Sequence, residues 1–168
     1  MNQPVDSLRD EIVALLPRLR RFARTIARNR EDADDLVQIA VERALIRAEQ
    51  WQPGTRLDSW IFQIMRNAWI DEVRSRVRHD KVFAPEEAGE NVGEATMEAH
   101  LQAMAVRTAM GQLNEDQRMV IGLVLVEGLP YKEAAEVLEI PVGTLTSRLA
   151  RAREALQAIL SEPKRSEA

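Results

Sequence analysis

Apolar residues recur every three or four positions through most of the chain, and this spacing restricts the fold to packed helices. The apolar stripe of the first segment consists of Leu8, Ile12, Leu15, Leu16, Leu19, Phe22, Ala23 and Ile26. The same period predicts further helices at about 31–49, 57–78, 97–111, 113–127, 130–138 and 142–160. We therefore expect an all-α protein.

Polar residues mark where two of these helices begin. Asn29 is placed to cap the second helix, because asparagine side chains accept hydrogen bonds from the first free backbone amides. Asn114 is followed three residues later by Gln117, which is the spacing of a capping box.

The periodicity stops over residues 80–96, DKVFAPEEAGENVGEAT, where Gly, Pro and Glu accumulate. Such a segment cannot bury enough apolar surface to offset its ordering entropy, so we interpret it as a flexible acidic linker. We expect two small helical domains, residues 1–80 and 103–163, with the linker extending over residues 81–102. Each domain is large enough to fold as a helical unit.

Composition excludes several classes of function. The chain has no cysteine, and His79 and His100 stand far apart, so neither thiol chemistry nor a zinc site is expected. No apolar run approaches the roughly 18 residues of a membrane span. The sequence also lacks a Gly-rich phosphate loop and a nucleophile–base pair. We expect a cytoplasmic protein that needs no metal or cofactor, does not insert into membranes and is not an enzyme.

The segment IPVGTLTSRLARARE, residues 140–154, leads a helix with two distinct stripes. The apolar stripe contains Leu145, Leu149, Ala152 and Leu156, and the polar stripe contains Thr144, Ser147, Arg148 and Arg151. A short helix and a tight turn precede this helix, which is the pattern of a helix-turn-helix. Gly143 at its start lets the backbone approach DNA closely. The alternative is an ordinary solvated face, but the preceding helix, the turn and the hydroxyls favour DNA binding.

The run LNEDQRMVIGLVLVEGLPYKEAAEVLEIPVGTLTSRLARAREAL resembles the C-terminal domain of bacterial extracytoplasmic-function (ECF) sigma factors. The PVGT-x-x-SRLARAR run and the E-G-L-x-Y-x-E-A-A pattern carry the resemblance. In that family the domain binds the −35 promoter element. The resemblance implies DNA contacts by Thr144, Ser147, Arg148, Arg151 and Arg153, although helical angle places Arg153 away from the polar stripe.

The second helix, REDADDLVQIAVERAL, presents an acidic outer face. Its members are Asp34, Asp35, Gln38 and Glu42. Charge alone favours a solvated face, but the DDLVQ run is similar to region 2.2 of the family. The resemblance implies core RNA polymerase as a partner, through its β′ clamp helices and its β flap. The chain departs from the family at Ile39 and Ala40, where an acid and a threonine are more usual.

The third helix carries an aromatic residue at the head of a polar stripe. The stripe contains Trp60, Gln63, Asn67, Asp71, Arg74 and Arg78. Aromatic rings stack on unpaired bases and arginines hold the backbone, so the stripe suits melted DNA. Taken singly, Trp60 is more typical of the rim of a core. The motif SWIFQIMRNAWIDEVRSR resembles regions 2.3 and 2.4 of the family.

The loop QPGTRLDS, residues 52–59, occupies the position where the family captures a flipped −10 base. A plain turn explains its Pro-Gly pair equally well. The expected −10 contacts are Gln52, Thr55, Arg56, Trp60, Asn67, Arg74 and Arg78.

The resemblance covers about residues 8–160 and implies an alternative sigma factor. It would bind core polymerase, recognise the −35 and −10 elements and assist promoter melting. An anti-sigma factor would control its activity in a stress response. The linker would thread near the RNA exit channel or serve as a passive tether, and both interpretations stay open. The rival is a free-standing helix-turn-helix repressor or activator, which leaves the DDLVQ helix and the Trp60 stripe without a role.

Overall fold

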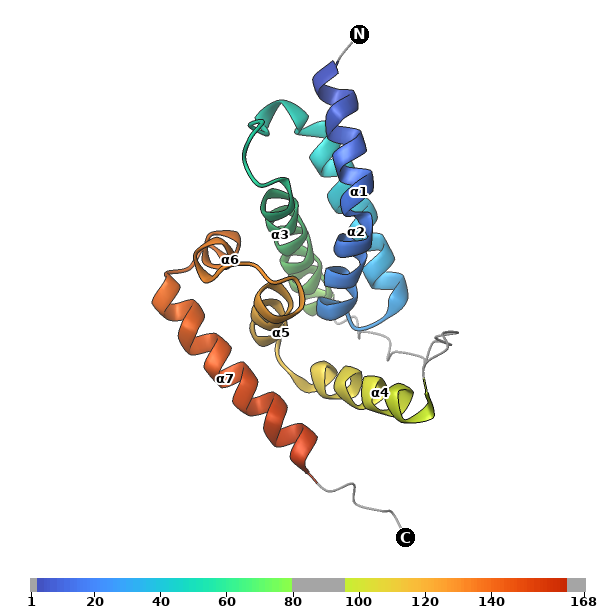
Figure 1. Ribbon diagram of the computed structural model, residues 1–168, viewed down its shortest axis with the longest axis vertical. Coiled ribbons are helices and arrows are strands. Elements are labelled where there is room, and N and C mark those ends of the chain that lie inside the picture. Colours follow the sequence, from blue (N-terminus) through green and yellow to red (C-terminus); the bar gives the residue numbers. More distant parts are fainter. Residues whose placement is uncertain (1–2, 80–95, 163–168) are drawn as a thin grey trace.

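The computed structural model describes residues 3–79 and 96–162, which fold into seven α-helices without a strand (Figure 1). The first three are α1 (Gln3–Ile26), α2 (Arg30–Ile46) and α3 (Leu57–Arg78), with the short 3₁₀ turn η1 (Ala48–Gln50) before α3. The others are α4 (Met97–Gln112), α5 (Glu115–Ile121), α6 (Tyr131–Leu138) and α7 (Val142–Ser161), and the π turn η2 (Gly122–Val126) extends α5. The all-α prediction is confirmed. None of these helices has both the length and the apolar content needed to cross a membrane.

In the N-terminal domain, α2 packs against both α1 and α3. The predicted stripe of α1 faces this core, with only Leu15 and Leu16 partly exposed. The Asn29 side chain accepts a hydrogen bond of 2.8 Å from the Asp32 amide, so the predicted cap of α2 is present.

The C-terminal domain contains the predicted helix-turn-helix, formed by α6 and α7. The capping box of α5 is complete, because the Asn114 and Gln117 side chains each accept from the other residue's backbone amide. Glu139 adopts a left-handed backbone (φ 55°) that ends α6 and turns the chain toward α7. Helix α4 begins at Met97, so residues 97–102 of the expected linker are helical. Residues 81–95 of that linker lie outside the described ranges.

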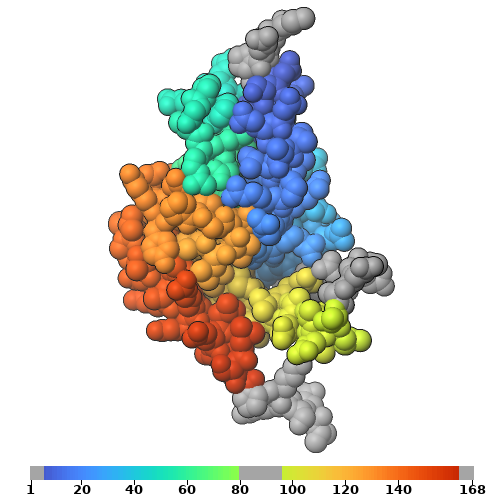
Figure 2. All heavy atoms as spheres, viewed as in Figure 1, coloured from blue at the N-terminus to red at the C-terminus, as the bar shows by residue number. Residues whose placement is uncertain are grey.

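The two domains pack against each other through a continuous buried core. Helix α6 lies on α3, while α5 and η2 lie on α1. In the space-filling view, the orange surface of the C-terminal domain abuts the blue and green surfaces of α1 and α3 (Figure 2). The C-terminal domain therefore sits beside the N-terminal half of α3, which carries part of the predicted −10 surface.

Candidate nucleic-acid interface

Helix α7 separates its two stripes as predicted. Leu145, Leu149 and Ala152 are buried and Leu156 is partly buried, which anchors the helix on the core. The residues on the polar side include exposed Gly143, Ser147 and Arg151 and half-buried Thr144 and Arg148. The α7 N-terminus is thus fixed by its apolar face and presents small and hydroxyl residues to solvent.

Two arginines of α7 differ from Arg151 in their surroundings. Arg148 lies 3.8 Å from a carboxylate oxygen of Asp116 on α5, and Asp116 is largely exposed, so this is a weak ion pair. Arg153 is exposed but lies two residues beyond Arg151, about 200° around the helix axis. Arg148 and Arg151 therefore share the polar stripe, and Arg153 lies on the other side of α7.

The outer face of α2 is open to solvent. Its predicted docking residues, all exposed, are Asp34, Asp35, Gln38 and Glu42. Asp32 has a different role, since both of its carboxylate oxygens accept from Arg76 of α3 at 2.5 and 2.9 Å. That hydrogen-bonded carboxylate raises the pKa of Arg76 and ties the end of α3 to the start of α2.

A groove between α2 and α3 adjoins this acidic face. Its apolar lining includes Leu36, Ile39 and Trp69, and Asp35 and Glu72 supply acidic groups. Ile39 is 39% exposed, so the departure from the family pattern places an apolar side chain beside the predicted docking acids.

The loop before α3 is shaped by its own backbone. Gly54 has φ +89°, and the Thr55 hydroxyl donates to the Gln52 carbonyl at 2.6 Å. The Gln52 and Thr55 side chains are exposed. Trp60 is partly buried and packs on the core, so it has both a core-rim role and an exposed portion.

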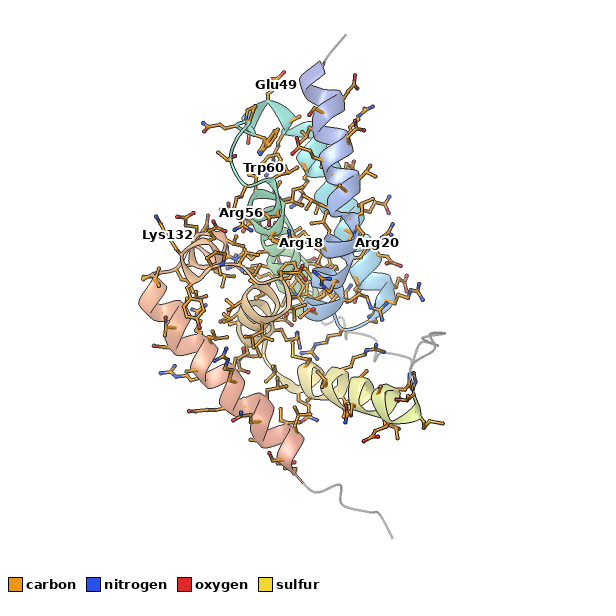
Figure 3. All side chains as sticks on the ribbon, viewed as in Figure 1. Arg18, Arg20, Glu49, Arg56, Trp60 and Lys132 are labelled. Atoms are coloured by element: carbon orange, nitrogen blue, oxygen red, sulfur yellow. The ribbon has the colours of Figure 1, made fainter. Side chains whose placement is uncertain are left out.

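Arg56 is already engaged in the folded chain. It donates to Asp58 at 2.8 and 3.2 Å and pairs with Glu133 of α6. Asp58 also accepts from Arg18 of α1 at 2.9 Å. Burial alone would raise the pKa of Asp58, but the hydrogen bonds from Arg56 and Arg18 outweigh it and the net pKa is lowered. Figure 3 shows Arg56 on the side of α3 that faces α6, and Arg18 where α1 approaches α3.

The polar stripe of α3 divides into a covered half and an open half. Gln63 and Arg66 donate to the Glu139 carboxylate at 3.1 and 3.2 Å, and Arg66 also donates to Asn67. Arg74 and Arg78 are exposed. Of the predicted −10 contacts, Gln52, Thr55, Asn67, Arg74 and Arg78 are exposed, whereas Arg56 pairs with Glu133 of α6.

Several residues that connect the two domains are not predicted by the sequence pattern. Glu127 is buried and pairs with Arg18 and Arg21, and the Trp69 indole donates to Glu115 at 2.7 Å. One signal exists for Glu127, because it is a charged residue that ends the apolar run VIGLVLV. The identity of its partners depends on tertiary packing.

Comparisons with known proteins assign both domains. Residues 12–79 match the family model for sigma-70 region 2, and residues 103–156 match that for sigma-70 region 4. The chain is 39% identical over 155 residues to the ECF RNA polymerase sigma factor EcfG of Rhodopseudomonas palustris, covering 92% of this chain and 86% of that protein. It is 34% identical over 142 residues to the ECF sigma factor SigM of Mycobacterium tuberculosis, covering 84% and 71% respectively.

A solved structure supports the same assignment. The sigma factor RpoE of Bartonella quintana, in complex with the anti-sigma factor NepR, matches with a TM-score of 0.79 and 31% identity. The match covers 92% of this chain and 96% of that one. CnrH, in complex with the cytosolic domain of CnrY, shares the fold with a TM-score of 0.68 and 24% identity. The chain belongs to the extracytoplasmic-function family of RNA polymerase sigma factors.

Proposed function

We propose that this sigma factor directs core RNA polymerase to promoters through three separate surfaces. Helix α7 reads the −35 element, the loop before α3 and the polar stripe of α3 read and help melt the −10 element, and the acidic face of α2 docks on polymerase. The observation that carries the proposal is that all three predicted surfaces lie on helices with buried apolar faces or in the loop that leads directly into one. Association with polymerase and promoter DNA follows from family membership, and the assignment to residues is the proposal.

Readout of the −35 element rests on the polar stripe of α7. An arginine fork donates to O6 and N7 of guanine, and hydroxyls contact bases or phosphates in the major groove. Arg151 is exposed, and Arg148 gives up only its weak pair with Asp116. Gly143 has no heavy atom within 4 Å of where a Cβ would lie, so the start of α7 is open to a DNA backbone.

Docking on polymerase rests on charge and rigidity. Asp34, Asp35, Gln38 and Glu42 are exposed on one helix whose opposite face is buried. A rigid acidic surface complements a basic one and speeds encounter. The β′ clamp helices are the expected site on polymerase, and the C-terminal domain reaches the β flap.

Control by an anti-sigma factor is part of the proposal. Two solved neighbours, RpoE and CnrH, are sigma factors in complex with NepR and with the cytosolic domain of CnrY, respectively. A comparable protein would hold this chain inactive until a stress signal releases it, in the cytoplasm where polymerase acts. The chain itself catalyses no step, because phosphodiester synthesis belongs to polymerase.

The experiment that tests this function measures binding to a pool of promoter fragments, with and without core polymerase. Specific retarded complexes are expected only when chain and core are both present. Nanomolar binding by the chain alone, with no gain from core, would contradict the proposal and favour a free-standing regulator.

A further inference from the structure

We propose that the C-terminal domain is a removable cover over part of the −10 surface, held closed by three carboxylates. These are Glu127, Glu133 and Glu139, which together we call the latch. The masking of DNA contacts rests on the function proposed for α3, whereas the closure itself does not.

Glu127 is the central member of the latch. Its side chain has no exposed surface, and both of its carboxylate oxygens accept from Arg21 of α1 at 2.8 Å. Arg18 of α1 adds a third contact at 3.4 Å. A buried carboxylate without its cations is strongly unfavourable. The negative charge of Glu127 is therefore balanced by arginines only while the C-terminal domain packs on α1.

Glu133 and Glu139 contact residues in or beside the proposed −10 surface, to which Arg56 and Gln63 belong and which Arg66 adjoins through Asn67. Glu133 pairs with Arg56, and Glu139 accepts from Gln63 at 3.1 Å and from Arg66 at 3.2 Å. Guanidinium groups bind carboxylate and phosphate through the same fork geometry. Promoter DNA and α6 therefore compete for Arg56, and the domains must part before Arg56 and Gln63 can bind DNA.

The closed form also leaves little room for a side chain at Gly122, where η2 meets α1. A Cβ on Gly122 would lie 3.1 Å from the Phe22 ring and 3.2 Å from the methyl group of Thr25. Phe22 is fully buried and packs edge-on against Phe62 at 4.9 Å between centroids, so it has little room to retreat. Gly122 itself has helical dihedral angles, which alanine adopts readily. An alanine here would oppose closure without breaking the helix.

The solved neighbour supports the link between closure and inactivity. One superposition on the Bartonella quintana sigma factor covers 92% of this chain, so both domains match in a single arrangement. That sigma factor is in complex with an anti-sigma factor. In this chain, internal contacts stabilise a similar arrangement.

The test compares two opening variants with matched controls by small-angle X-ray scattering of the full chain. Gly122→Ala opposes closure by steric contact, and its control is Gly111→Ala, because a Cβ on Gly111 meets nothing within 4 Å. Glu127→Gln removes the latch charge, and its control is Glu136→Gln, an exposed acid of α6. Circular dichroism checks that each variant keeps its helices, and Glu133→Gln/Glu139→Gln replaces any opening variant that unfolds.

Both opening variants should increase the radius of gyration while both controls keep that of the parent chain. Unchanged scattering in Gly122→Ala and Glu127→Gln, or equal expansion in the controls, would overturn the closure.

Masking is tested separately by run-off transcription at limiting chain concentration. The apparent affinity of a chain is its intrinsic affinity multiplied by its open fraction, so folded opening variants should raise transcript yield above that of the parent chain and of both controls. An expanded variant with unchanged yield would overturn masking while leaving closure established. Absence of transcripts from every variant, the parent chain included, would instead contradict the proposed function.

Discussion

Arg21 donates from Nε and Nη2 to the two carboxylate oxygens of Glu127, each at 2.8 Å, across 106 residues of sequence. This hydrogen-bonded carboxylate raises the pKa of Arg21. Such a bidentate, charge-assisted pair is among the stronger polar contacts in proteins. It joins the loop before the helix-turn-helix to the first helix of the other domain. The two proposed DNA-reading surfaces are therefore coupled through one fold, with α7 open and α3 partly covered.

Arg151→Ala should weaken promoter recognition at the −35 element. Loss of one guanine or phosphate contact removes about 1–3 kcal/mol of binding, so transcription at limiting chain concentration should fall by about five-fold to over a hundred-fold. If Arg151 contacts phosphate, the slope of log affinity against log salt should also decrease by about one.

The matched control for that change is Gln157→Ala, which truncates an exposed residue further along α7. It should transcribe at the parent level. Equal activity of the Arg151 variant and this control, measured on a −35-dependent promoter, would remove α7 from the proposed interface.

Asp58→Asn should destabilise the chain in a pH-dependent way. Asp58 accepts hydrogen bonds from Arg18 and Arg56, and contacts of this charged kind contribute about 1.5–3 kcal/mol. Its folded pKa is lowered, whereas an unfolded aspartate titrates near about 3.9. The stabilisation is therefore fully present above about pH 4 and is lost as the pH falls toward the lower folded pKa.

Urea unfolding at neutral and acidic pH checks this prediction. The parent chain should have the higher free energy of unfolding at pH 7, and its advantage over the variant should shrink below about pH 4. A constant difference across that range would show that the Asp58 carboxylate does not carry the effect.

Asn114→Ala should lower the stability of the C-terminal domain by about 0.5–2 kcal/mol, because it removes the cap from α5. Asn114→Ser retains a side-chain acceptor and should recover most of the loss. Hydrogen exchange of the α5 amides measures both variants. Equal protection in the alanine variant and the parent would mean that packing alone fixes the start of α5.

The elements of this fold follow from local sequence. Apolar spacing located the helices, and side-chain chemistry located the caps at Asn29 and Asn114, because both signals act within one or two turns. The same logic separated the two faces of α7, since Leu145 and Arg151 lie at fixed angles on one helix. These features need no knowledge of the partner helices.

The contacts between domains could not be predicted in the same way. Glu127 lies 106 residues from Arg21, and Glu133 lies 77 residues from Arg56. Which acid meets which arginine depends on the angle at which two helical units dock, and helical periodicity carries no information about that angle. The sequence pattern therefore predicts Arg56 as a DNA contact, whereas in the structure Arg56 forms an ion pair with Glu133 of the other domain.

Run-off transcription with purified core polymerase, comparing the parent chain with Asp35→Arg, tests the central claim most directly. Glu49→Arg is the matched control, because it makes the same charge reversal at an exposed residue of η1 outside the docking face. We expect discrete transcripts with the parent chain and the control, and their loss with Asp35→Arg. Full activity of Asp35→Arg would contradict docking through α2, and no transcripts from a folded parent chain would contradict its role as a sigma factor.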